Sequence, residues 1–181
     1  MKKSAVLIAF VIASFLLSAC VPTDLSPVDI GPNFSENTGA YELDFVQLHN
    51  DVLSSFEEEN PFVFVTGLDI NGSNGERKVT VDAAVMPGIS EEDAGYFMAA
   101  VLRFLNDAAA IQDTRIKASD QSGFGNLYSI YSLTAKVADE NGSEIASWNI
   151  PAGEAIPLDP DIETYYESWE KAMEIYQRNN Q

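Results

Sequence analysis

Apolar residues in the middle of this chain follow a helical period first and strand-like patterns afterwards. Between positions 41 and 59 they recur at Tyr41, Phe45, Leu48, Val52 and Phe56. Steps of three and four residues place these side chains on one stripe, so the segment is predicted to form an amphipathic helix. Asn60-Pro61 ends this helix, because proline disfavours the helical conformation in the residue before it.

Four later segments have the composition or the alternation that is typical of strands. They cover residues 62–71, 77–86, 127–138 and 144–150. Asn71-Gly72-Ser73-Asn74-Gly75 separates the first two and Asn141-Gly142 the last two, which predicts two hairpins. The repeated Asn-Gly-Ser sequence also suggests two similar ββα units, but hairpin turns of any origin favour Asn-Gly.

A helix is predicted after each hairpin. Ser90 and Asp93 form a capping-box-like start for a helix that runs to about Gln112. Asp159 is the expected N-cap of the final helix, with Pro160 at its first position. The element order is therefore α-ββα-ββα. A single hairpin is not stable alone, so we predict an α+β fold of two layers: a four-stranded, mainly antiparallel sheet with helices on one face.

The first twenty residues have the pattern of an export signal. Lys2 and Lys3 precede an uncharged apolar stretch over residues 5–17, which is short for a transmembrane helix. Leu17-Ser18-Ala19-Cys20 follows directly and resembles the lipobox of bacterial lipoproteins. The resemblance covers residues 1–20 only. It implies lipid transfer to the Cys20 thiol, cleavage after Ala19 and usually acylation of the new amino terminus.

The same resemblance implies where the mature protein resides. In Gram-negative cells Val21 resembles the pattern of lipoproteins sent to the outer membrane, where the domain would face the periplasm. In other bacteria the expected location is the outer face of the cytoplasmic membrane. Residues 20–39 would then form the lipidated cysteine and a linker of roughly 60 Å when extended, and residues 40–181 the single α+β domain. The alternative is a plain secretory signal with an incidental cysteine.

Charge narrows the choice of partners. The chain has a formal charge of -18, and loss of Lys2 and Lys3 with the signal leaves 8 basic against 28 acidic residues, or -20. Such a surface repels phosphate backbones and anionic lipid headgroups, so we expect no nucleic-acid partner and no membrane contact other than the lipid on Cys20. With Cys20 as the only cysteine, no disulfide can form within the mature chain.

Few residues qualify for catalysis. His49 is the only histidine, and its sequence neighbour Asp51 would not face it on a helix, so His49 is interpreted as an ordinary helix residue. Gly123-Phe124-Gly125 lacks the lysine and the context of a phosphate loop and is interpreted as a mobile loop. We therefore assign no catalytic residue and expect no enzyme.

Acidic residues could in principle bind a cation. Four residues imitate the start of a calcium loop, namely Asp69, Asn71, Ser73 and Glu76. Asn74 stands where that loop requires glycine, and Thr80 where it requires glutamate, so the segment is interpreted as a turn. We expect no metal ion and no cofactor.

An aromatic stripe on the predicted final helix is the candidate interaction surface. It consists of Tyr165, Tyr166, Trp169 and Tyr176. Aromatics at this spacing usually pack on a sheet, but any exposed part would suit an envelope protein as partner. The sequence thus favours a non-enzymatic, membrane-anchored accessory or interaction module. A lipid-anchored protein that binds a small ligand or cation is the alternative, and an envelope hydrolase with paired carboxylates is a second one.

Overall fold

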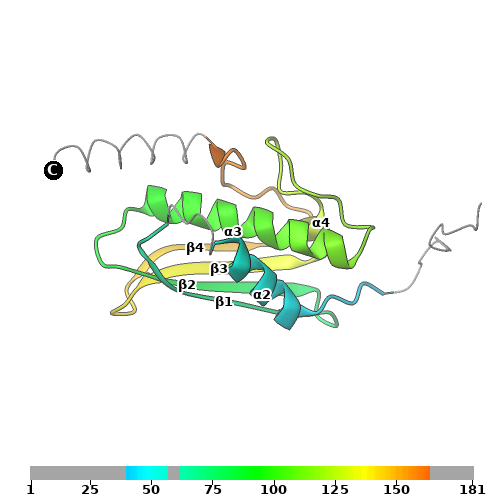
Figure 1. Cartoon of the computed structure of the whole chain (residues 1–181), viewed down its shortest axis with the longest axis horizontal. Helices are drawn as coiled ribbons and strands as arrows, with labels where there is room; N and C mark the ends of the chain where they lie inside the picture. Colours follow the sequence, from blue (N-terminus) through cyan, green and yellow to red (C-terminus); the bar gives the residue numbers. More distant parts are fainter. Residues whose placement is uncertain (1–39, 57–61, 164–181) are drawn as a thin grey trace, which may run out of the picture. The chain divides into compact units, whose positions relative to one another are not determined.

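Four strands form one open sheet in the order β1-β2-β3-β4 (Figure 1). The computed structural model describes residues 40–56 and 62–163. The strands are β1 (Val65–Ser73), β2 (Lys78–Val85), β3 (Ser132–Asp139) and β4 (Glu144–Ile150). The pairs β1–β2 and β3–β4 are antiparallel, and the central pair β2–β3 is parallel. The predicted α+β class with a mainly antiparallel sheet is confirmed.

Helices α2 (Phe45–Ser55) and α3 (Glu91–Gln112) lie on the same side of the sheet (Figure 1). The alternation of buried and exposed residues along β2 explains why the helices pack on this side. In β2 the residues Val79, Val81, Ala83 and Val85 are buried, whereas Lys78 before them and Asp82 among them are exposed. Burying one face under helices and leaving the other to solvent is the arrangement that an alternating antiparallel strand favours.

Helix α3 connects the two hairpins and explains the parallel central pair. Ser90 caps it as predicted, since its hydroxyl oxygen accepts a hydrogen bond from the Asp93 backbone N–H at 3.0 Å. The helix has 22 residues, a length of about 33 Å. It therefore returns the chain along the whole sheet before β3 begins, and parallel strands need such a crossover.

Aromatic rings fill the core between α2, α3 and the start of β1. Phe97 of α3 is 1% exposed and Phe62 is fully buried. Their ring centroids lie 5.3 Å apart, in an edge-to-face arrangement. Phe56 adds an edge-to-face contact with Phe104 at 5.1 Å. Such pairs contribute about 0.5–1.5 kcal/mol beyond the area they bury.

Four predicted boundaries are wrong by a few residues, and a capping or turn hydrogen bond accounts for the first two. Helix α2 starts at Phe45 and not at residue 41, because the Asp44 carboxylate caps it. Strand β1 starts at Val65, after a turn in which the Val65 N–H donates to the Phe62 carbonyl. The segment predicted as a strand from residue 127 begins instead with the short helix α4 (Leu127–Ile130). Residues 160–162 are not helical, so the final helix does not start at Pro160.

The first hairpin turn is displaced relative to the prediction. Residues 74–77 form it, and Asn71 and Gly72 belong to β1, where they pair with Thr80 and Val79. Gly72 has no room for a side chain, since the Phe45 ring occupies the place of a Cβ. In the second hairpin Gly142 does lie in the turn, with φ +81°. The two Asn-Gly-Ser sequences therefore occupy different structural positions and do not support an internal repeat.

Several predictions fall on parts of the chain that the structure does not describe. Cys20, the lipobox and the linker precede residue 40, and the aromatic stripe Tyr165, Tyr166, Trp169 and Tyr176 follows residue 163. They stay predictions. Among the helices of residues 40–56 and 62–163, none combines the length and the apolar character needed to cross a bilayer.

Candidate functional site

An open groove of about 550 Å³ lies where the first turns of α3, strand β4 and the segment after β4 meet. We call it the aromatic groove. Its lining residues are Glu91, Glu92, Gly95, Tyr96, Trp148, Pro157, Leu158 and Asp159. The lining residues of α3 are distant in sequence from Trp148 and from residues 157–159, so the groove exists only in the folded domain.

Strand β4 positions Trp148 at the edge of the described sheet. Trp148 pairs with Ala135 of β3. The residues on either side of it along this face, Ala146 and Ile150, are buried, whereas Trp148 stays half-buried. No strand covers β4 on its outer side within the described sheet, so part of the indole is left to form the groove wall.

The segment after β4, which forms the third side of the groove, is held against α3 by polar and apolar contacts. Arg103 of α3 donates a hydrogen bond from Nη1 to the Pro160 carbonyl at 2.8 Å. Ile162 is 7% exposed and belongs to the core. Leu158 packs over Gly95, where a Cβ would lie 3.6 Å from Leu158 Cδ2. These contacts place Leu158 and Asp159 beside Tyr96.

The groove is negatively charged. Glu91 and Glu92 lie in the first turn of α3, and Asp159 lines the groove from the segment after β4. The helix N-terminus stabilises nearby carboxylates by about 0.3–1 kcal/mol each, which explains why two acids are tolerated there. None of the three forms an ion pair with any residue that the structure describes. The groove therefore combines aromatic surface with negative charge that the described cations do not neutralise.

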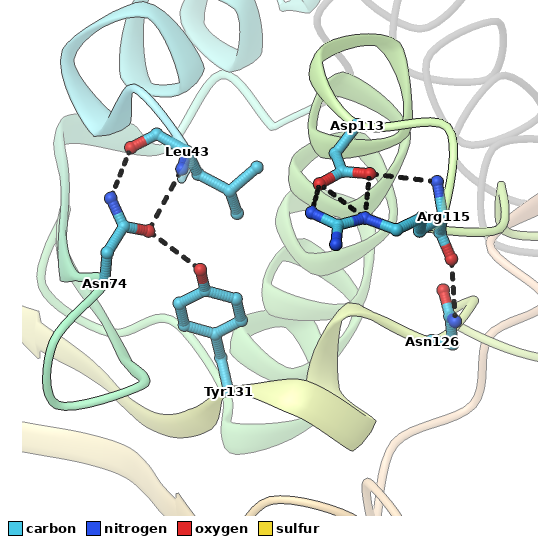
Figure 2. A network of polar contacts seen from close by, with 6 residues as sticks. All are labelled: Leu43, Asn74, Asp113, Arg115, Asn126 and Tyr131. Atoms are coloured by element: carbon cyan, nitrogen blue, oxygen red, sulfur yellow. Dashed lines mark hydrogen bonds and ion pairs between the residues drawn. The ribbon is translucent and has the colours of Figure 1, made fainter. Parts of the chain in front are cut away.

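A second polar assembly, the Tyr41 cluster, holds the beginning of the described domain. It consists of Tyr41, Leu43, Asn74, Arg77, Asp113, Arg115, Asn126 and Tyr131. Figure 2 shows Asn74 between Leu43 and Tyr131. The Asn74 side chain accepts from the Leu43 N–H and donates to the Leu43 carbonyl, both at 3.0 Å, and accepts from the Tyr131 hydroxyl at 2.8 Å. Burial raises the pKa of Tyr131, which keeps this hydroxyl a neutral donor.

Two arginines stack on the Tyr41 ring in the same cluster. The guanidinium carbon of Arg115 lies 4.0 Å from the ring centroid and that of Arg77 lies 5.1 Å from it. Arg77 has φ +51° in the hairpin turn, a conformation that costs an ordinary residue about 1–2 kcal/mol. Asp113 accepts from Arg115 Nε at 2.9 Å and forms an ion pair with Nη2 (Figure 2). The cluster has the contacts of a structural clamp, because its polar groups mostly pair with one another.

The Asp113–Arg115 pair predicts an acid-sensitive part of the stability. The hydrogen bond from Arg115 lowers the pKa of Asp113 below its usual value. A carboxyl with a lowered folded-state pKa stabilises the protein above its unfolded pKa, about 3.9, and loses that contribution as the pH falls through the folded value. We expect Asp113→Asn to lower the unfolding free energy at pH 7, and the difference from wild type to shrink towards zero at pH 2.

Urea unfolding at pH 7, 4, 3 and 2 measures this difference. Asp82→Asn is the control, since it removes one negative charge from an exposed strand position. A difference between wild type and Asp113→Asn that stays constant down to pH 2 would show that the effect is steric and not electrostatic.

The residues singled out from the sequence have local partners in the structure. His49 lies on α2, and its Nδ1 accepts a hydrogen bond from the Ile70 N–H of β1 at 3.1 Å. Asn71 donates to Asp69, and Ser73 accepts from the Glu76 N–H. In the described ranges no group of three or more His, Cys, Asp or Glu side chains is arranged to hold a metal ion.

The sequence reasoning missed the two aromatic residues of the groove. Tyr96 lies within the segment predicted as a helix and Trp148 within the segment predicted as a strand, and no motif singled out either residue. One signal was present: a tryptophan on the apolar face of a short strand, between Ala146 and Ile150, is too large to be covered easily.

Comparisons with protein-family models, with curated proteins and with solved structures give no match for this chain. A functional conclusion therefore rests on its own residues and geometry.

Proposed function

We propose that this protein is a lipid-anchored lipoprotein of the bacterial cell envelope whose domain is a non-enzymatic interaction module. The aromatic groove is the observation that carries the second part of the proposal. Its half-buried Tyr96 and Trp148 stand on a helix and a strand, so the surface is rigid before a partner arrives. Tyrosine and tryptophan on preformed surfaces are enriched where proteins bind one another.

The openness of the groove favours a macromolecule over a small substrate. Sites for small ligands usually enclose 70–90% of the ligand surface. The groove is instead open to solvent between α3, β4 and residues 157–159. A partner that contributes several side chains can cover such a surface, and this supports an interaction module over the alternative of a small-ligand carrier.

Replacement of Cys20 tests the lipid anchor. We expect Cys20→Ser to remove fatty-acid labelling completely and to release the protein from the membrane fraction, because two or three acyl chains are needed for stable anchoring. Metabolic labelling with a palmitate analogue, followed by fractionation, measures both effects. Ser18→Ala, which leaves the only cysteine in place, is the control. A wild-type protein that is exported but neither labelled nor membrane-bound would contradict the anchor and support a plain secretory signal.

In-cell crosslinking of the tethered protein tests the interaction module. We expect one abundant envelope protein to be recovered with the chain, at a yield well above that for an unrelated lipoprotein of similar abundance. Mass spectrometry identifies it. Failure to recover any specific protein, under conditions in which the unrelated lipoprotein yields its own partner, would overturn this function.

A further inference from the structure

We propose that the aromatic groove recognises a segment of the partner protein that carries lysine or arginine side chains. This inference rests on the proposed function and names the chemistry of the partner. Two features of the groove favour a partner with positively charged side chains. Its carboxylates at Glu91, Glu92 and Asp159 have no ion-pair partner in the described structure, and its walls include the rings of Tyr96 and Trp148.

Both features recognise cations, by different physical means. Carboxylates accept short, charge-assisted hydrogen bonds from ammonium and guanidinium groups. Tryptophan and tyrosine faces attract the same groups and also pack against the apolar stems of lysine and arginine. A groove with only acids would suit any cation, and a groove with only aromatics would suit any apolar group. The combination favours long side chains that have an apolar stem and a positive end.

The setting of the groove favours a polypeptide segment as the bearer of these groups. Trp148 stands on the edge strand of the described sheet, so a partner can approach from the side without displacing another strand. A single small amine would stay largely exposed in so open a groove. Several basic side chains on one segment can contact the acids of α3 and Asp159 together. The net charge of the chain, -18, would also accelerate the approach of a basic partner.

Neutralising the groove without changing its shape provides the test. The triple variant Glu91→Gln, Glu92→Gln, Asp159→Asn removes its three charges. A matched variant, Glu76→Gln, Asp82→Asn, Glu140→Gln, removes two glutamates and one aspartate from exposed positions outside the groove. Both variants change the net charge equally, so only a local effect distinguishes them. Thermal melting of both variants verifies that each remains folded.

The first measurement uses photo-crosslinking in cells with the full, tethered chain. A photoreactive residue replaces Pro157 at the rim of the groove or, as a reference, Asn149, which alternates to the opposite face of β4. We expect crosslinking to another envelope protein from position 157, through a peptide with at least two lysine or arginine residues. This crosslink should be lost in the groove variant and kept in the matched variant.

The second measurement uses a named probe with the full-length protein in non-ionic detergent. Fluorescence anisotropy follows the binding of a labelled ten-residue peptide of alternating lysine and serine. Because the groove variant loses three exposed charge contacts, we expect it to bind the peptide about tenfold more weakly than wild type. The matched variant should bind within about twofold of wild type, because distant exposed charges are screened.

Each other outcome overturns the inference and separates it from the proposed function. A crosslink from position 157 that survives in the groove variant would show that a protein binds there without cationic recognition. A crosslink to a protein from position 149 only would preserve the interaction module and remove the groove from it. A crosslink confined to the chain itself would show that its own residues occupy the groove. Absence of crosslinks from both positions would overturn the inference and the module together.

Discussion

Replacement of Gly125 by alanine is expected to lower the unfolding free energy by about 3–5 kcal/mol. Gly125 has φ +74°, a left-handed conformation that costs alanine about 1–2 kcal/mol. A Cβ at this position would also overlap the Asn106 side chain and the Lys117 carbonyl.

The overlap matters because Asn106 is fully buried on α3 and holds the loop that follows the helix. Its Nδ2 donates to the Lys117 carbonyl at 2.9 Å, and its Oδ1 accepts from the Leu127 N–H at 3.1 Å. Displacing Asn106 leaves buried polar groups without partners, at about 1–3 kcal/mol for each. The loss of both bonds would also release α4, which begins at Leu127.

Gly123→Ala is the matched control in the same loop. A Cβ at Gly123 meets nothing within 4 Å, and its φ is not in the left-handed region. We expect a change within about 1 kcal/mol, with a small gain if the unfolded chain loses freedom. Urea denaturation of both variants measures the difference. Equal stabilities would show that the Asn106 contacts contribute little to the fold.

Phe97→Ala is expected to lower the unfolding free energy by about 3–5 kcal/mol, the usual cost of removing a buried phenylalanine. Phe97 is 1% exposed and makes ring contacts with Phe56, Phe62 and Phe64 at centroid distances of 5.8, 5.3 and 6.4 Å. Three rings from other segments therefore lose their common neighbour, and the cavity lies between α2, α3 and the start of β1.

Ile111→Ala provides the comparison on the same helix. Ile111 is 81% exposed, so its truncation should change stability by less than about 0.5 kcal/mol. Thermal and urea unfolding, monitored by circular dichroism, measure both variants. If Phe97→Ala cost less than 1.5 kcal/mol, the aromatic core would have to collapse around the site far more readily than cores usually do.

The residues that we expect to stabilise the fold and those that we propose to bind a partner lie in different parts of this domain. Gly125, Asn106 and Phe97 belong to the framework, and none of them lines the aromatic groove. Variants of these residues should therefore lose folding and binding together, whereas the groove variants should lose binding alone. This separation allows a failed interaction to be distinguished from a failed fold.

The loop around Gly123-Phe124-Gly125 shows how an interpretation from sequence can miss a buried anchor. Its glycines suggested a mobile loop. In the structure Phe124 is 8% exposed, and Asp107 of α3 accepts hydrogen bonds from the Ser119 N–H and hydroxyl at 2.6 and 2.8 Å. The loop is therefore tied to the helix. Side chains eleven or more residues away supply these contacts, and no local pattern reports them.

Local patterns in the sequence determined the type and most of the extent of the regular elements. The Ser90 cap, the helical period up to Gln112 and the strand over residues 144–150 all agree with the structure. These features depend on interactions between residues close in sequence, such as a helix cap, a turn or an apolar face with a regular period. The sequence displays such patterns directly.

Tertiary structure alone decided the rest. Gly72 pairs with Val79 in the sheet under the Phe45 ring, and Asn106 accepts a hydrogen bond from the first residue of α4, where a strand was predicted. The crossover through α3 joins central strands that are parallel. The aromatic groove also arises in this way, since Tyr96 and Trp148 become neighbours only when α3 packs beside β4. Contacts between residues distant in sequence depend on how whole elements pack, and the period of a single segment does not encode that packing.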